Sequence, residues 1–255
     1  MLALHPERDL LFVGRSMSAV SPPTRIGVVT RSDMSVEEID VLFPRPHAIA
    51  VGPDGERVYT ASLGVNQIAA VDASAETARV TSLPGGRTHT IVQFAVSPDG
   101  STLVATAQLT ALLLVFDLSD PDRPELVDEI PVAAQPWHPA FSPDGRFVYF
   151  GNKTADRITV VDMESRTVVA SIQGEGIGEP HGAAVSADGR RVFVSNSHTG
   201  MAMDMGGAPM PAPPPAAAGQ SHPGTVVVID AAARRIVRVI EVGSGPTGVG
   251  TRPTS

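Results

Sequence analysis

Short apolar runs alternate with polar turns along the whole chain, and the same order of run and turn returns at a nearly fixed interval. The clearest marker is an Asp-Gly turn, preceded by proline in three copies and by alanine in the fourth. Its aspartates are 45, 45 and 44 residues apart, at Asp54, Asp99, Asp144 and Asp188. A repeat of this length, built from strand-like segments, predicts a β-propeller, because one unit cannot bury its apolar face alone and must stack on its neighbours.

Each copy divides into four predicted strands. The first is short and rich in small apolar residues, as in 48–51 and 183–185, which suits the innermost strand of a ring that narrows toward its axis. The second follows the Asp-Gly turn, and the fourth alternates apolar and polar residues, as in 167–172, which is typical of a half-exposed outer strand. The third ends in an aspartate in every intact copy, at Asp72, Asp117, Asp162 and Asp230. We therefore expect an all-β fold, a propeller of four-stranded antiparallel blades.

Five copies fill the chain as a single domain. Their expected bounds are about 1–45, 46–90, 91–135, 136–179 and 180–245, and one further strand is expected within 246–255. The first copy is degenerate, since His5-Pro6-Glu7 stands in place of the Asp-Gly turn. Two arrangements fit this count: a closed ring of five blades, or part of a longer ring of seven.

The composition narrows the possible functions. The formal charge of −8 and the scattered lysines and arginines argue against a surface for nucleic acid. With no cysteine, the chain has no disulfide, zinc–thiolate site or thiol nucleophile. The longest apolar stretch, 109–116, is too short to span a membrane, and the first residues do not resemble a signal peptide. These features leave the cellular compartment open.

Several motifs resemble the YVTN-type β-propeller repeat. They are the Pro-His pairs Pro46-His47 and Pro180-His181, the Ser-Pro-Asp-Gly turns and the run 192–196, and the resemblance covers nearly the whole chain. The repeat is similar to those of a superfamily that also holds lactonase-type propellers, quinoprotein amine dehydrogenase heavy chains and the haem-d1 domain of nitrite reductase. Because such proteins have unrelated activities, the resemblance implies an architecture rather than a reaction. It also implies a periplasmic or extracellular location, since related proteins are often exported.

Six of the seven histidines are expected on one face of the propeller. In each blade, the connection that leads into the inner strand and the connection between the second and third strands emerge on the same face. His47, His89, His138 and His181 lie at the starts of inner strands, and His198 and His222 flank the second-to-third connection of the fifth copy. Only His5 belongs to the opposite face.

The connection flanked by His198 and His222 is also enlarged. Pro180 and Pro246 are 66 residues apart, 22 more than the 44-residue repeat, and we expect 199–223 to form a flexible loop rich in Met, Pro and Ala. Thioethers and imidazoles are ligands that Cu(I) prefers. The candidate metal ligands are therefore His47, His138, His181, His198, Met201, Met203, Met205 and His222.

A purely structural explanation of the same histidines is the alternative. Pro-His before an inner strand belongs to the repeat, so these imidazoles can simply hydrogen-bond main-chain carbonyls where the strand begins. In the fourth copy Trp137 takes the place of His47, with His138 one residue later, which interrupts a regular ring of ligands.

Three functions remain open at this point. The first is a scaffold that binds a protein or a small-molecule ligand through its histidine-bearing rim. The second is a redox or metal-binding propeller associated with copper or haem, which would use the rim histidines and the methionine loop. The third, implied only by the resemblance, is a lactonase-like hydrolase in which Arg45, Arg87 and His181 would contact an acidic, sugar-derived ring.

Overall fold

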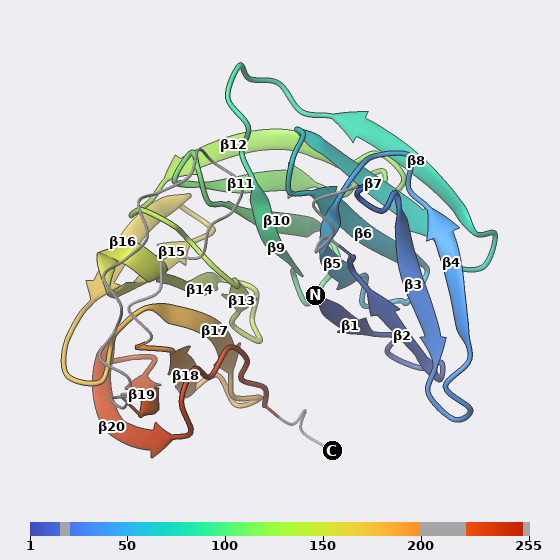
Figure 1. Cartoon of the computed structure of the whole chain (residues 1–255). Helices are drawn as coiled ribbons and strands as arrows, with labels where there is room; N and C mark the ends of the chain where they lie inside the picture. Colours follow the sequence, from blue (N-terminus) through green and yellow to red (C-terminus); the bar gives the residue numbers. More distant parts are fainter. Residues whose placement is uncertain (16–20, 199–222, 252–255) are drawn as a thin grey trace.

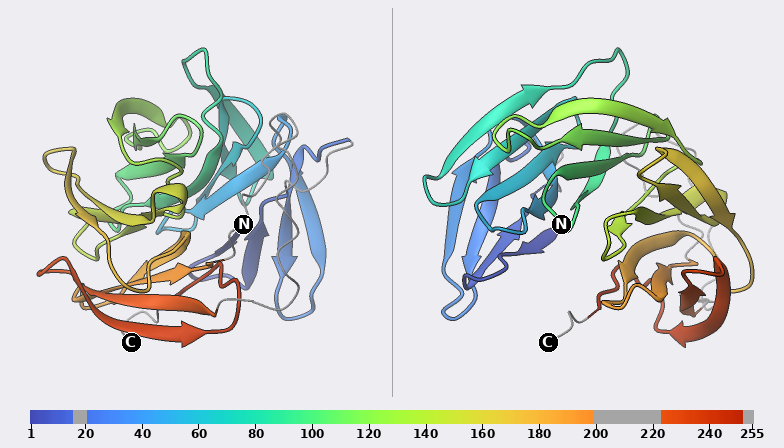
Figure 2. Two further views of the ribbon diagram at one scale, coloured as in Figure 1. Left: turned by 60° about the vertical axis from the view of Figure 1, so that its left-hand side comes forward. Right: turned by 180° about the vertical axis from the view of Figure 1, so that it is seen from behind.

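The computed structural model of the protein describes residues 1–15, 21–198 and 223–251, and this part of the chain contains strands and one short 3₁₀ turn but no α-helix. The strands form five four-stranded antiparallel sheets, which confirms the predicted fold class. Figure 1 shows the sheets following one another around an arc, with the first strand of each turned toward the middle. The reverse view in Figure 2 shows the same arc, open between the first and last sheets.

Each sheet is one blade, numbered in chain order. Blade 1 contains β1 (Leu2–Leu4), β2 (Leu10–Val13), β3 (Arg25–Thr30) and β4 (Val36–Asp40). Blade 2 contains β5 (Pro46–Val51), β6 (Arg57–Ser62), β7 (Gln67–Asp72) and β8 (Thr77–Ser82). Blade 3 contains β9 (Ile91–Val96), β10 (Thr102–Ala107), β11 (Leu112–Asp117) and β12 (Glu125–Pro131). Blade 4 contains β13 (Ala140–Phe141), β14 (Phe147–Asn152), the 3₁₀ turn η1 (Lys153–Ala155), β15 (Arg157–Asp162) and β16 (Thr167–Ile172). Blade 5 contains β17 (Pro180–Val185), β18 (Arg191–Asn196), β19 (Gly224–Asp230) and β20 (Arg235–Val242).

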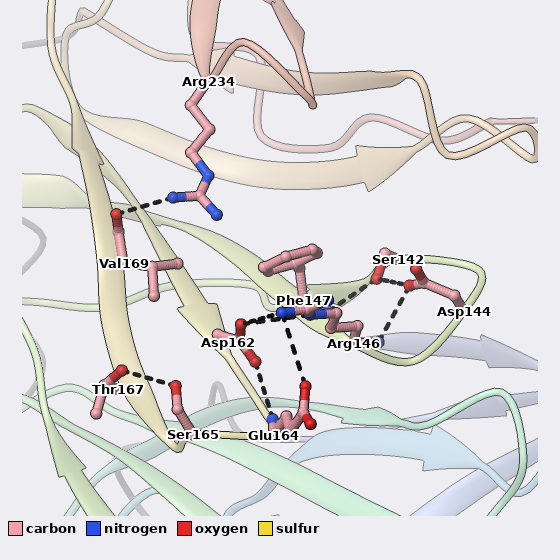
Figure 3. Close-up of polar contacts among 10 residues, drawn as sticks. All are labelled: Ser142, Asp144, Arg146, Phe147, Asp162, Glu164, Ser165, Thr167, Val169 and Arg234. Carbon is pink, nitrogen blue, oxygen red and sulfur yellow. Dashed lines mark hydrogen bonds and ion pairs between the residues drawn. The ribbon is translucent and has the colours of Figure 1, made fainter.

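The Asp-Gly turns hold the first two strands of each blade together through one repeated hydrogen-bond pattern. In blade 4, Ser142 Oγ donates to Asp144 and accepts the N–H of Phe147, while Asp144 accepts the N–H of Arg146 (Figure 3). Gly145 follows with φ 73°, a left-handed conformation that glycine adopts without steric penalty. The same serine–aspartate bond recurs in blades 3 and 5. The motif is therefore a structural turn.

The aspartates that end the third strands organise the next turn. Asp162 accepts the N–H of Glu164 and pairs with Arg146 at 3.1 Å (Figure 3). Asp72 accepts the N–H groups of Ser74 and Ala75, and these bonds, that of Ala75 first, lower its pKa to about 2. Their repetition and their bonding give these carboxylates a structural role rather than a catalytic one.

Apolar side chains fill the spaces between successive blades. Phe12 and Ile26 of blade 1 share a buried cluster with Ile49 and Val58 of blade 2, and equivalent clusters join the later blades. Full burial of one such side chain contributes roughly 1.5–3 kcal/mol. Since each blade buries its face only against a neighbour, these layers hold the arc together.

Where the blades are closest, main chain meets main chain. A Cβ added to Gly151, at the end of β14, would lie 2.6 Å from Pro180 Cβ and 2.8 Å from Pro180 O at the start of β17. Gly14, just after β2, makes the same kind of approach to the carbonyl group of His47 in β5. Glycine at these positions lets the start of an inner strand lie directly against the preceding blade.

The strand expected after residue 246 does not form within the described residues 246–251. This segment contains Gly248 and Gly250, and glycine in an extended segment supplies no side chain to pack. Thr251 Oγ1 instead donates to the carbonyl of Val185, so the segment lies against β17 as irregular chain.

The close approach at Gly151 can be tested with a substitution that adds a single methyl group. We expect Gly151→Ala to lower the free energy of unfolding by about 1–3 kcal/mol, since the new Cβ collides with the main chain of Pro180. Urea unfolding measures the change. Gly86→Ala is the matched control, because a Cβ at Gly86 meets nothing within 4 Å. Equal stability of the two variants would contradict this account of the interface.

Candidate functional site

Three of the predicted histidines come together with a tryptophan at the inner-strand starts of three blades. His47 lies in β5, His181 lies in β17, and Trp137 and His138 lie just before β13. The ring centroids of His138 and His181 are 4.7 Å apart, and those of Trp137 and His181 are 4.2 Å apart. His47 is also close, since the charge of His181 lowers the pKa of His47, and the charges of His181 and His47 lower the pKa of His138. We call these four residues the central histidine cluster.

A repeated backbone device positions the cluster. In each of blades 2 to 5, one residue shortly before the inner strand has a left-handed conformation, and its carbonyl accepts the N–H of the residue that directly follows the second strand of the same blade. The four residues, with their φ angles, are Arg45 (57°), Thr90 (54°), Gln135 (51°) and Glu179 (49°). Left-handed backbone at a non-glycine residue stores about 1–3 kcal/mol of strain. The surrounding hydrogen bonds maintain it, and it turns the next residues toward the middle of the arc.

A lysine that the sequence pattern did not single out lies beside the cluster. Lys153 begins η1, directly after β14, and its N–H donates to the carbonyl of Gln135 at 2.8 Å. This bond places its side chain next to Trp137, with Nζ 5.5 Å from the ring centroid. Lys153 is only 5% exposed. Among the described residues, neither Lys153 nor Arg45, two residues before His47, forms an ion pair with a carboxylate.

The three imidazoles are neutral at neutral pH. Burial is the main cause, and it lowers the pKa of His47 to about 4, of His138 to about 3 and of His181 to about 4. Neighbouring positive charge acts in the same direction: first that of the N-terminal ammonium and then that of Arg45 lower the pKa of His47, and that of Lys153 lowers the pKa of His181. The site is therefore cationic through Lys153 and Arg45, while its imidazoles offer uncharged hydrogen-bonding groups.

Several of these groups are buried without a hydrogen-bond partner in the described part of the chain. They are Trp137 Nε1, His138 Nε2, His181 Nδ1 and Arg45 Nε. Trp137 is 2% exposed and His181 is 6% exposed. An unsatisfied buried polar atom costs about 1–3 kcal/mol, and native structures contain few of them. Three of these atoms belong to the rings of Trp137, His138 and His181, which contact one another, so the cluster is the candidate functional site.

The other predicted ligands are not part of the cluster. His198 lies at the end of the described part of blade 5, where its Nε2 is 3.3 Å from the carbonyl oxygen of Gly176 and 3.2 Å from Thr225 Oγ1. Met201, Met203, Met205 and His222 lie outside the described residues, as does nearly all of the insertion expected at 199–223. Within residues 1–15, 21–198 and 223–251, no group of three or more His, Cys, Asp or Glu side chains is arranged to hold a metal ion. The copper site stays a prediction.

Two further residues that the sequence placed on the same face, His89 and Arg87, have different environments. His89 is buried, with Nδ1 3.0 Å from Thr110 Oγ1 and its N–H donated to Asn66, so its contacts are those of a structural residue. Arg87 donates to the carbonyl of Leu109 from an exposed position. The structural explanation of rim histidines thus fits His89, whereas it does not account for the unpartnered atoms of His138 and His181.

Open grooves occur away from the cluster, between outer strands. One of about 660 Å³ separates β8 from β12 and is lined by residues 79–84 and 123–126. It offers both apolar and arginine side chains at the outer edge of blades 2 and 3. No helix in the described segments is long and apolar enough to cross a membrane.

Comparisons with known proteins support the architecture. Residues 79–187, less than half of the chain, match the family model described as lactonase, 7-bladed β-propeller. No curated protein matches the chain. Among solved structures, the chain is similar to Kuenenia stuttgartiensis hydrazine synthase, with a TM-score of 0.63 and 21% sequence identity over 78% of this chain and 49% of that one.

These similarities establish a β-propeller. At 21% identity the likeness to hydrazine synthase concerns the fold alone, and this chain spans about half the length of that structure. The lactonase match includes Trp137, His138, Lys153 and His181, although it ends two residues after β17.

The neutral histidines predict an acid-sensitive fold. An unfolded histidine titrates near pH 6.5, so between about pH 6.5 and 4 the unfolded chain binds protons that the folded cluster does not. Stability is therefore fully present above pH 6.5 and falls as the pH drops toward 4, by up to about 1.4 kcal/mol per pH unit for each histidine. Urea unfolding at a series of pH values measures the slope.

His138→Asn should flatten this pH dependence, because it removes one of the depressed groups. His5→Asn serves as the control, since His5 lies in the turn between β1 and β2, outside the cluster, and an asparagine oxygen can still accept the N–H of Glu7. Identical slopes for the wild type and His138→Asn would show that the cluster histidine is not buried in its neutral form.

Proposed function

We propose that the protein is a YVTN-type β-propeller that binds a small-molecule ligand through the central histidine cluster. The observation that carries the proposal is the set of buried, unpartnered nitrogens on Trp137, His138 and His181, which come from two different blades and face a common region. A fold that needed these side chains only for packing would be more stable with apolar residues in their place. A ligand that forms the missing hydrogen bonds explains why polar groups are kept there.

The site has features expected of a small-molecule site rather than a protein-binding surface. The buried Trp137 ring packs against His138, His181 and Lys153, so an aromatic group and a few polar groups converge there, as in many ligand sites. His47 and His138 are half-buried, so part of the cluster is exposed to solvent. A protein partner would instead need a broad exposed surface.

Trp137 is the only tryptophan of the chain, so its fluorescence reports on this site directly. We expect at least one compound in a library of organic acids, sugars, lactones and amines to change that fluorescence saturably. His181→Ala should weaken binding by about 10-fold or more, the effect of losing one good hydrogen bond in a buried site. His5→Asn should leave the affinity unchanged. A library without any saturable response, or equal affinities of wild type and His181→Ala, would refute the proposal.

Lactone hydrolysis is the second candidate function, and the family match over residues 79–187 supports it. A neutral His181 can accept a proton at Nδ1 from a water molecule as the water oxygen attacks the lactone carbonyl. The ring C–O bond then breaks, the ring oxygen takes up a proton, and the open product is a hydroxy acid that ionises at neutral pH.

A panel of lactones, followed by the base needed to hold the pH constant, tests this reaction. Turnover by the wild type that is lost in His181→Asn and kept in His5→Asn is the expected result. Hydrolysis that persists at the wild-type rate in His181→Asn, or no hydrolysis of any lactone, would eliminate the lactonase candidate while leaving ligand binding intact.

Copper binding makes a different prediction from both. Purified protein would then contain stoichiometric copper that is lost on deletion of residues 201–222, and His181→Ala would reduce the copper content. Metal analysis by mass spectrometry distinguishes this outcome from ligand binding, because Trp137 fluorescence should respond to an organic ligand whether or not the deletion is present.

A further inference from the structure

We propose that the groove between β16 and β20, at the outer edge of blades 4 and 5, binds an extended acidic segment of a partner protein. The groove has a volume of about 630 Å³ and is lined by residues 171–175 and 234–239. It lies between outer strands, whereas the central histidine cluster lies at the starts of inner strands. The proposal therefore does not depend on ligand binding at that cluster.

The groove has an excess of positive charge, although the chain as a whole has a formal charge of −8. Of the described residues that line it, three are arginines and one is acidic: Arg234, Arg235, Arg238 and Glu175. None of these four residues forms an ion pair within the described part of the chain. Clustered cations without counter-charges attract a partner that carries carboxylates.

The neighbouring pair of blades shows how such an arginine is paired elsewhere in the fold. In both blade 4 and blade 5, the residue directly before the outer strand is an arginine with left-handed backbone, Arg166 (φ 53°) and Arg234 (φ 50°). Arg166 reaches the preceding outer strand, β12, where its Nη1 lies 3.7 Å from Asp128 Oδ2. Arg234 also reaches the preceding outer strand, β16, but there its Nη1 donates to main chain, the carbonyl of Val169, at 3.1 Å (Figure 3).

The strand register identifies Ala170 as the counterpart of Asp128. Asp128 pairs with Val115 at the register shift between β11 and β12, and Ala170 pairs with Val160 at the equivalent shift between β15 and β16. Blade 4 thus has a methyl group where blade 3 has the carboxylate that binds the next arginine. A carboxylate of a partner, placed in the groove, would supply the ion pair that the other interface forms internally.

The sides of the groove suit an extended peptide. The apolar residues Ile172, Ile236 and Val239 line it and belong to the cluster between blades 4 and 5, so an apolar side chain can pack against them. Since β16 and β20 are the last strands of their sheets, one edge of each has main-chain N–H and C=O groups without a strand partner in the described structure. An extended peptide can bond such an edge, and its successive side chains point to opposite sides. A segment of alternating acidic and apolar residues therefore matches the groove.

Synthetic peptides of eight residues, the length of β20, test this match. The probe is a fluorescently labelled peptide of alternating glutamate and valine. One control peptide has lysine in place of glutamate, and a second has proline in place of valine, which removes main-chain N–H groups. In anisotropy titrations we expect saturable binding of the glutamate–valine peptide and at least about 10-fold weaker binding of both controls. Higher ionic strength should weaken the binding.

Substitutions at Ala170 test the missing carboxylate directly. Ala170→Asp provides an internal partner for Arg234, so it should weaken binding of the glutamate–valine peptide about 10-fold or more. Ala170→Asn has nearly the same size without the charge and should keep the affinity within about 3-fold of the wild type. Thermal unfolding verifies that each variant is folded. If Ala170→Asp fails to fold, the double variant Arg235→Gln/Arg238→Gln, which changes two exposed side chains, should show the same loss of affinity.

Several outcomes would overturn the proposal. They are no binding of the glutamate–valine peptide, equal affinities of the Ala170→Asp and Ala170→Asn variants for it, and equally tight binding of the lysine peptide. Equally tight binding of the proline peptide would overturn the extended, strand-like mode. Tripolyphosphate and phosphatidylserine vesicles are measured alongside the peptides. If either of them binds in a way that Ala170→Asp abolishes while the glutamate–valine peptide does not bind, the groove takes a different anion and the protein partner is refuted.

Discussion

Close contact between the main chains of successive blades is the constraint on which the rest of this structure depends. The inner strands crowd together around the middle of the arc, and at Gly151 and Gly14 the spacing leaves no room for even a methyl group. Because β14 touches the start of β17 in this way, His181 is brought within ring-stacking distance of Trp137 from the neighbouring blade. The same contact at Gly14 sets the position of His47.

The opposite face of the arc is fixed by a second set of close contacts. The proline of each Asp-Gly turn lies against the glycine of the next one: an added Cβ would be 3.2 Å from Pro53 at Gly100, 3.6 Å from Pro98 at Gly145 and 3.5 Å from Pro143 at Gly189. The repeated motif therefore forms a turn within one blade and also spaces it from the next. With both ends of the inner strands held, the side chains at their starts are presented from a rigid frame, which favours binding at defined positions.

The sequence predicts most of the fold because the signals for it are local and repeated. Alternating apolar residues, the Asp-Gly turns and the strand-end aspartates recur in nearly every blade. A weak signal in one copy therefore does not change the fold that the other copies predict. The degenerate first copy still forms a four-stranded sheet, where His5 Nδ1 accepts the N–H groups of Glu7 and Arg8 in place of a turn aspartate.

The site is less predictable from the sequence, because it depends on which blades bring the first residues of their inner strands close together. The repeat shows that His47, His138 and His181 share a face, but not that His198 turns away to Gly176 and Thr225. Lys153 carries no motif of its own, and it reaches the cluster only through the bond between its N–H and the Gln135 carbonyl. The left-handed residue before each inner strand leaves no sequence signal either, because Arg45, Thr90, Gln135 and Glu179 have nothing in common as side chains.

The charges around the cluster determine which ligands its histidines are suited to bind. When only residue types are considered, three histidines in a chain that also contains a methionine-rich segment suggest metal ligands, because imidazole and thioether groups are the donors that copper prefers. In the folded chain the same imidazoles lie beside Lys153 and Arg45, whose charges help to keep them neutral and raise the free energy of any added cation. A neutral imidazole next to a fixed positive charge supplies a hydrogen bond without adding charge, and its orientation decides whether it donates or accepts that bond.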